Sequence, residues 1–103
     1  MRVAFKMKLF PGHQAEYKKR HDALWPELKE LLIQVGVEHY SIFLDERTLD
    51  LIGTLIIKDA KSLHALSDHA VMKKWWAYMK DIMETNPDNS PVSIELSQVF
   101  NLK

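Results

Sequence analysis

The order in which the hydrophobic spacing changes along the chain restricts its fold more than any other feature. Residues 3–9 alternate in the period of a strand with one buried face, and the alternation stops at a Pro-Gly pair. Over residues 13–35 the apolar residues recur three and four positions apart, which is typical of a helix, and the pattern closes near Gly36. Because Pro26 cannot donate a backbone hydrogen bond, we expect a kink or a new helix start just after His21.

The remaining segments continue with two strands, helical segments and a last strand. Two runs rich in β-branched and aromatic residues, joined by a short polar turn, predict a hairpin in which Tyr40, Ile42 and Leu44 share one face. In sequence order, we expect strands over residues 37–45 and 49–58, a short helix capped by Asp59 or Ser62 and ending near Ser67, a helix over residues 70–84, a turn over residues 86–91 and a strand over residues 92–100.

This succession of elements is the order of the ferredoxin-like βαββαβ arrangement. We therefore predict an α+β fold in which an antiparallel sheet carries both helical segments on one face. A sheet covered on one side leaves an apolar surface on the other. The usual solutions are a dimer, a bound ligand or an RNA-stacking surface.

The composition argues against several classes of function. Fourteen Lys and Arg residues balance fourteen Asp and Glu residues, so no net field favours nucleic acid or an anionic membrane, and a small neutral partner fits better. The chain has no cysteine, which excludes disulfides, a thiolate nucleophile and Cys-based metal sites. No stretch approaches the roughly 20 apolar residues of a membrane span. We expect a single domain over residues 1–103 that is soluble and cytoplasmic.

Tyr17 and His21 are the strongest candidates for chemistry. They lie four positions apart, just before Trp25, so a helix directs a phenol and an imidazole the same way. Imidazole, with an unperturbed pKa of about 6.5, both gives and takes a proton near neutral pH, which makes the pair a plausible acid/base site. The simpler alternatives are a solvated or structural histidine and a tyrosine at the edge of the core.

Trp75 and Trp76 are adjacent, so on a helix their side chains point about 100° apart. The simpler interpretation makes one of them core and the other a partly exposed cover, whereas a functional one uses a flat indole as the platform for a sugar ring. Tyr40 likewise either packs across strands or reaches a ligand with its hydroxyl. His64 and His69 lack the spacing of a zinc-binding helix, so we predict no metal site.

Four segments together resemble the L-rhamnose mutarotase family. They are Tyr-Lys-Lys-Arg-His at residues 17–21, Leu-Trp-Pro-Glu-Leu at 24–28, Lys-Trp-Trp at 74–76 with Met79, and Asn-Pro-Asp-Asn-Ser-Pro-Val at 86–92. No single segment is diagnostic, but the paired tryptophans followed by that turn, behind the Tyr/His helix, are specific in combination. The resemblance spans nearly the whole chain.

The resemblance implies an enzyme that interconverts the α and β anomers of L-rhamnopyranose by opening and closing the ring, with no redox step and no cofactor. It also implies a homodimer in which two ferredoxin-like protomers form an α+β barrel. Carried over by position, it implies His21 as the proton donor and Tyr17, Tyr40, Trp75 and Trp76 as residues that contact the sugar.

Three other functions stay open. Dimeric α+β barrels also host small monooxygenases and haem-binding proteins in which a helix histidine faces the cleft. A non-catalytic sugar-binding or dimerising module would use the same aromatic residues without turnover. An RNA-recognition domain fits least, because the charge is balanced and no strand carries the basic and aromatic pattern of such domains.

Overall fold

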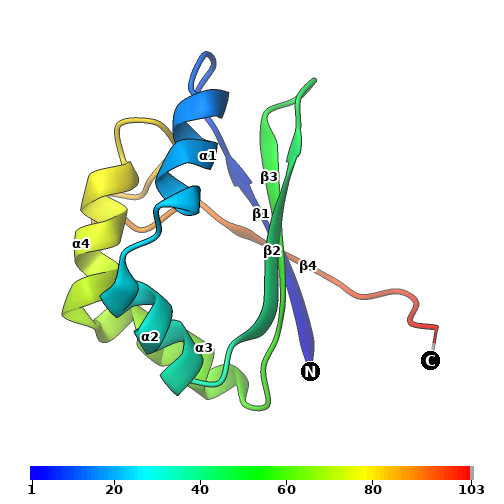
Figure 1. Cartoon of the computed structure of the whole chain (residues 1–103). Helices are drawn as coiled ribbons and strands as arrows, with labels where there is room; N and C mark the ends of the chain where they lie inside the picture. Colours follow the sequence, from blue (N-terminus) through cyan, green and yellow to red (C-terminus); the bar gives the residue numbers. More distant parts are fainter. Residues whose placement is uncertain (103) are drawn as a thin grey trace.

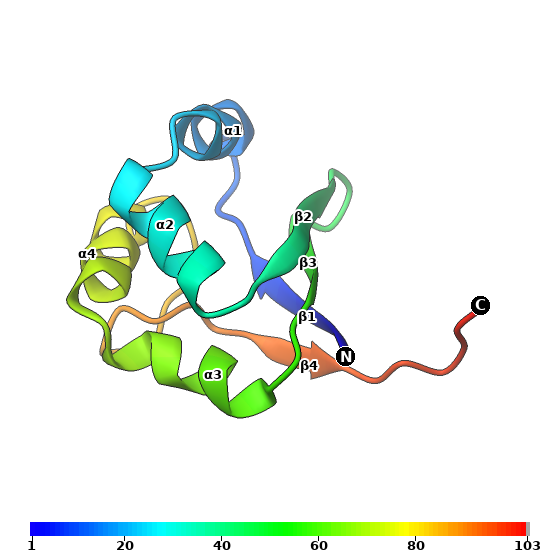
Figure 2. The ribbon, with the colours of Figure 1, turned by 60° about the horizontal axis from the view of Figure 1, so that its bottom comes forward.

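The computed structural model describes residues 1–102 and has two layers, a sheet and a set of helices that cover one of its faces (Figures 1 and 2). The strands lie in the order β2-β3-β1-β4, and each neighbouring pair is antiparallel. In chain order the elements are β1 (Arg2–Lys8), α1 (Gln14–Asp22), α2 (Pro26–Gln34), β2 (Glu38–Asp45), β3 (Asp50–Ile56), α3 (Ala60–Ala65), the 3-10 turn η1 (Leu66–Asp68), α4 (Ala70–Met79) and β4 (Ile94–Leu96). The ferredoxin-like α+β fold is confirmed.

The core lies between the two layers. Alternate side chains of β1 and β3 face the helices, as the two-residue spacing predicted, and α2 and α4 supply the opposite side. Its buried hydrophobic residues are Met7, Leu9, Tyr17, Leu28, Leu31, Leu51, Leu55, Ile57, Leu66, Trp75, Met79, Ile82 and Met83.

The central strands β1 and β3 also support Tyr40, an aromatic residue of the neighbouring strand β2. Phe5 of β1 lies opposite Gly53 of β3, and paired residues of this kind share a face of the sheet. A Cβ atom added at Gly53 would lie 2.6 Å from Cε2 of Phe5, so the ring needs a glycine beneath it. The Phe5 ring in turn meets Tyr40 of β2 edge-on, with 6.1 Å between the ring centroids. Phe5, packed over Gly53, therefore supports the ring of Tyr40.

The predicted interruption of the first helical stretch is confirmed as a restart. α1 ends at Asp22, and α2 begins with Pro26 at its first turn, where a missing N–H costs nothing. Trp25 before it is extended, with φ −58° and ψ 132°, as a residue preceding proline prefers. α1 is therefore a separate helix whose direction does not depend on α2 (Figure 1).

The predicted helix over residues 70–84 is too long, because α4 ends at Met79. Beyond it the backbone bonds to the end of β1 instead of continuing the helix: Phe10 N–H donates to the Ile82 carbonyl at 2.9 Å, and Glu84 N–H donates to the Lys8 carbonyl at 3.0 Å. The apolar residues whose spacing suggested a helix here, Ile82 and Met83, are instead buried beside the end of β1.

The predicted last strand is also too long. β4 covers Ile94–Leu96 and pairs only with Ala4 to Lys6 of β1. The residues after it extend away from the body of the molecule (Figure 1), with Val99 and Phe100 both exposed. Two adjacent apolar residues break the strand alternation, and a segment beyond the end of its partner has no ladder to join.

The sheet face without helices carries exposed apolar residues, with the polar residues Lys6 and Thr54 among them. Ile94 and Leu96 of β4 pair with Lys6 and Ala4, which places them on this face, where Phe43 of β2 also lies. Phe43 is 64% exposed and Ile94 57% exposed. This agrees with the uncovered apolar surface that the element order predicted. What covers that surface stays a prediction.

Candidate active site

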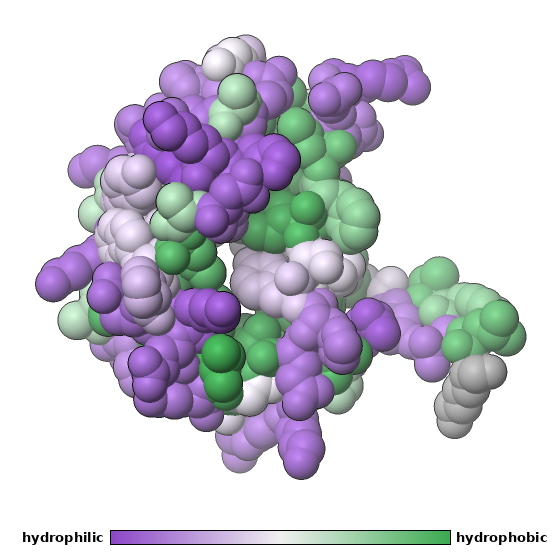
Figure 3. Space-filling model, viewed as in Figure 1, coloured by the Kyte–Doolittle hydropathy of each residue, from purple (hydrophilic) through white to green (hydrophobic). Residues whose placement is uncertain are grey.

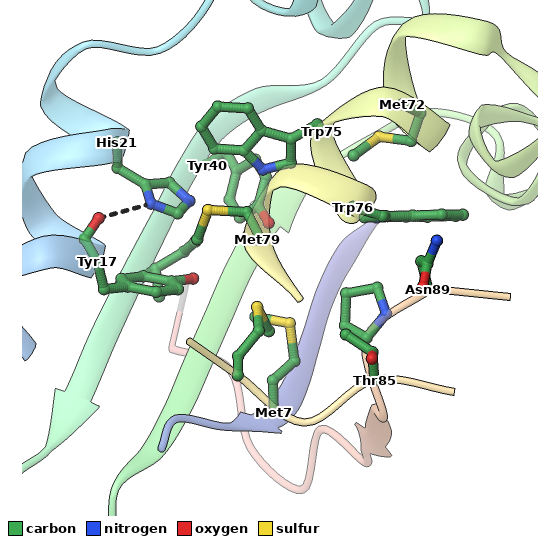
Figure 4. Close-up of a pocket in the computed structure, with 13 residues that line it drawn as sticks. Met7, Tyr17, His21, Tyr40, Met72, Trp75, Trp76, Met79, Thr85 and Asn89 are labelled. Carbon is green, nitrogen blue, oxygen red and sulfur yellow. Dashed lines mark hydrogen bonds between the residues drawn. The ribbon is translucent and has the colours of Figure 1, made fainter. Parts of the chain in front are cut away.

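A hollow between the helices and the sheet gathers all five residues that the resemblance singled out (Figures 3 and 4). It holds about 400 Å³ of empty space, a volume that includes the part open to solvent. α1 contributes Tyr17 and His21, β2 contributes Tyr40, and α4 contributes Trp75 and Trp76. The other lining residues are Met7, Ile42, Met72, Met79, Met83, Thr85, Asn89 and Pro91.

The His21 ring is held in one orientation. Its Nδ1 lies 3.0 Å from the backbone carbonyl oxygen of Tyr17, and because a carbonyl can only accept, Nδ1 carries a proton and donates it. The ring stacks on the Tyr17 phenol with 4.3 Å between centroids and meets Trp75 edge-on at 5.4 Å. In the neutral ring Nε2 is therefore the basic nitrogen, and it points toward the hollow (Figure 4).

The surroundings of His21 favour its neutral form. Burial lowers the pKa of His21, and the hydrogen bond to the Tyr17 carbonyl and the charge of Asp22 oppose part of that effect. A neutral imidazole with a fixed tautomer can take a proton at Nε2 and return it. This is the property that a general base and acid near neutral pH requires.

Both tyrosines of the hollow remain phenols over the physiological range. Burial, helped by the nearby Tyr40, raises the pKa of Tyr17, and burial raises the pKa of Tyr40 to about 12. Tyr40 is nevertheless 40% exposed as a whole residue. The pKa of a phenol responds to the surroundings of its oxygen, so we take the exposed surface to belong to the rest of the residue. Each hydroxyl can donate a hydrogen bond to a ligand.

The two tryptophans divide as the helical geometry predicted. Trp75 is 6% exposed and packs edge-on against Trp25, with 5.0 Å between centroids. Trp76 is only partly buried and presents the flat side of its indole near the far end of the hollow (Figure 4). Trp75 thus serves both the core and the wall beside His21, whereas Trp76 is free to contact a ligand.

Arg20 ties α1 to the end of α4, although its side chain is not part of the hollow. Its Nη1 and Nη2 donate to the two carboxylate oxygens of Asp81 at 2.9 and 3.1 Å, and its Nε donates to Glu16 at 2.7 Å. Nη1 also donates to the Tyr78 carbonyl at 2.7 Å, and the guanidinium lies 4.3 Å from the centre of the Tyr78 ring. These contacts position the helix that carries Tyr17 and His21.

Sequence reasoning missed two groups of lining residues. Thr85, Asn89 and Pro91 come from the turn region after α4, where the sequence indicated turn chemistry and gave no sign that the turn faces the hollow. The sequence did hold a signal for the methionines. Met72, Met79 and Met83 share the helical spacing of Trp76, which would place them on the same side as that residue.

Within residues 1–102, no group of three or more His, Asp or Glu side chains is arranged to hold a metal ion. Over the same part of the chain, no helix combines the length and the apolar character needed to cross a membrane.

The fold and the hollow define the class: a ferredoxin-like α+β protein with a hollow of aromatic walls and a partly buried imidazole. The family model described as L-rhamnose mutarotase matches residues 2–102. An L-rhamnose mutarotase from Brucella anthropi is 57% identical over 101 residues, which cover 98% of this chain and 95% of that protein. The chain belongs to the L-rhamnose mutarotase family.

Solved structures agree with this assignment. The crystal structure of an L-rhamnose mutarotase from Formosa agariphila superposes with a TM-score of 0.94 at 50% identity, covering 100% of this chain and 99% of that one. An antibiotic biosynthesis monooxygenase superposes with a TM-score of 0.52 at 12% identity, covering 95% of this chain and 97% of that one. At such low identity the second likeness shows the fold alone.

Proposed function

We propose that this chain interconverts the α and β anomers of L-rhamnopyranose and that His21 moves the proton. Membership of the L-rhamnose mutarotase family supports the reaction and the substrate. The role of His21 rests on one observation: its Nδ1 is bound to the Tyr17 carbonyl, which leaves Nε2 toward the hollow as the nitrogen that exchanges a proton.

Ring opening begins when Nε2 of neutral His21 takes the proton of the anomeric hydroxyl. The bond between C1 and the ring oxygen breaks, C1 becomes the aldehyde carbon, and the imidazolium gives its proton to the ring oxygen. Both oxygens are bonded to C1, so one nitrogen can serve both without a second acid. The protein is unchanged at the end of the step.

Closure reverses these transfers after rotation about the C1–C2 bond. The hydroxyl formed from the ring oxygen then attacks the opposite face of the aldehyde. The open chain has to stay in register for this to happen, and holding reacting groups in position is itself a large part of catalysis. In the proposal, the hydroxyls of Tyr17 and Tyr40 bind sugar oxygens while the indoles of Trp75 and Trp76 flank the ring.

Exchange NMR on L-rhamnose tests the proposal. His21→Ala should lower the enzyme-dependent anomer exchange at least about 100-fold, the lower end of what a positioned acid/base group contributes. The matched control is His64→Ala, which removes an exposed imidazole outside the hollow and should keep the wild-type rate. Wild-type exchange in His21→Ala would exclude His21 as the proton carrier.

Two further outcomes separate the alternatives. If the wild-type protein binds L-rhamnose, measured by tryptophan fluorescence, without accelerating exchange, it is a sugar-binding module. A Soret band on the purified protein, or a shift of that band when haem is titrated with the protein, together with no effect of L-rhamnose, would favour a haem protein.

We also propose that the protein acts as a homodimer joined through the sheet face without helices. The exposed Phe43 and Ile94 stand at the two edges of that face, with Ile52 and Lys6 between them across the sheet, and Leu96 follows Ile94 on β4. Large exposed apolar surfaces commonly mark interfaces, and a second copy offers the same apolar surface in return.

A further inference from the structure

The turn after α4 is built so that one residue, Asn89, adopts a left-handed backbone conformation. Its φ is +73°. Asn89 N–H donates to the Asn86 carbonyl at 2.9 Å, and Asn86 N–H donates to the Ser90 carbonyl at 2.7 Å. The carboxylate of Asp88 accepts from Ser90 N–H at 3.0 Å. These bonds account for the shape of the backbone.

The shape of the turn does not account for the side chain of Asn89. Glycine adopts a positive φ more readily than asparagine, so the turn alone would be served at least as well by glycine. The neighbouring polar side chains bond within the turn: Asn86 Nδ2 donates to Ser90 Oγ at 3.1 Å, and Ser90 Oγ donates to Asp88 at 2.5 Å. Within residues 1–102, the Asn89 carboxamide makes no such hydrogen bond in the turn.

The carboxamide of Asn89 lies at the end of the hollow opposite His21. Figure 4 shows it beside the flat indole of Trp76, with Thr85 close to it, whereas His21 and Tyr17 occupy the other end and Met79 lies between the two. An indole face with an adjacent carboxamide suits a sugar ring, because the C–H face of the ring packs on the aromatic surface and a hydroxyl is left to be bound.

We propose that Asn89 binds a ring hydroxyl of the sugar that is remote from the anomeric carbon, while Trp76 packs against the same part of the ring. A carboxamide has both a donor and an acceptor, so it can satisfy both hydrogen-bonding roles of one hydroxyl. The inference rests on the proposed function and adds a specificity determinant to it. Asn89 thereby sets which end of the sugar reaches His21.

The test uses Asn89→Gly, since glycine keeps the positive φ without strain and removes only the carboxamide. Calorimetry or tryptophan fluorescence should show a Kd for L-rhamnose raised about 3- to 10-fold, the loss expected for one hydrogen bond between uncharged groups. Asn101→Gly, the same substitution in the exposed C-terminal segment, is the control and should keep the wild-type Kd.

A second comparison separates a bound hydroxyl from a general loss of shape. For the wild-type protein, analogues of L-rhamnose that each lack one non-anomeric hydroxyl should bind more weakly, and the penalty for one of them should vanish in Asn89→Gly. Asn89→Asp keeps the shape of the side chain but loses its donors, so it gives the same comparison if the glycine variant folds poorly.

An unchanged Kd in Asn89→Gly, or equal penalties for every analogue in both proteins, overturns the inference while the proposed function stands. If the wild-type protein binds L-rhamnose but does not exchange its anomers, the proposed function fails and the Kd values still decide the role of Asn89. A wild-type protein that does not bind L-rhamnose overturns both.

Discussion

The reactivity of His21 depends on two local features that act on different properties. The hydrogen bond to the Tyr17 carbonyl, at 3.0 Å, selects which nitrogen is protonated. Burial against Tyr17 and Trp75 lowers the pKa of the ring, so that it is neutral in the resting protein. The first feature comes from the turn of α1 itself, and the second needs the packing of α1 against α4.

These features predict how the reaction responds to pH. In the proposed mechanism neutral His21 takes the proton, so exchange should fall as the pH drops through the pKa of His21 in the folded protein. Since burial lowers that pKa, the fall should begin below about pH 6.5, the ordinary value for histidine. Exchange rates measured from about pH 5 to 8, corrected for the uncatalysed reaction, check this.

Stability should change in the same direction. Between the lowered pKa and the ordinary one, the unfolded chain binds more protons at His21 than the folded protein, so the folded state loses stability as the pH falls through this window. If exchange already falls above pH 6.5, or if NMR titration gives His21 a raised pKa, the proposed role of a partly buried, neutral base is wrong.

At the scale of elements, α1 is held with few apolar contacts. Tyr17 is its one buried residue within the described chain. Arg20, with a side chain only 10% exposed, supplies the attachment to α4 through Asp81 and the Tyr78 carbonyl. The orientation of His21 toward Trp75 therefore depends on a polar contact outside the hollow.

Asp81→Asn should loosen this attachment. The amide offers one acceptor where the carboxylate offered two charged ones, so the free energy of unfolding should fall by about 1 kcal/mol, a modest value because Asp81 is largely exposed. Chemical denaturation measures it, and the pKa of His21 by NMR should move toward its ordinary value as the ring becomes more exposed.

The control for this prediction lies on the same helix. Lys18 and Asp22 form an ion pair at 2.8 Å whose side chains are 77% and 64% exposed, and such pairs contribute little. Lys18→Gln should leave both the stability and the pKa of His21 nearly unchanged. Equal effects of the two substitutions would show that Arg20 and Asp81 do not position α1.

Element boundaries show where sequence reasoning succeeded and where it did not. Pro26 correctly predicted the restart between α1 and α2, because the constraint that proline imposes is local. The end of α4 was missed, because the backbone around Ile82 bonds to Phe10, far away in the chain. The spacing of apolar residues cannot distinguish burial in a helix from burial against a strand over so short a segment.

At the scale of the molecule, the two faces of the sheet have different surroundings. One face carries the core and the hollow, and the other leaves Phe43 and Ile94 in contact with solvent in the isolated chain. A second copy packed on that face would bury them, which is the dimer that the family resemblance implied.

Phe43→Asp should weaken the dimer without unfolding the protomer, because it places a charge within the proposed interface on a side chain that is 64% exposed in the protomer. Sedimentation equilibrium should show a shift from dimer to monomer. Ile33→Asp is a matched control, since Ile33 is 62% exposed but lies on α2 in the helical layer. A wild-type protein that is monomeric at micromolar concentration, or equal effects of both substitutions, would contradict the interface.

The sequence by itself determined the order of the elements and hence the ferredoxin-like fold, and it determined that Tyr17 and His21 share a face of α1. Both follow from spacing along a few turns or strands, where each side chain's direction depends on its neighbours. Only the tertiary structure decided that Tyr40, Trp76 and Asn89 meet at one hollow, because residues far apart in the chain are brought together by packing and pairing between elements.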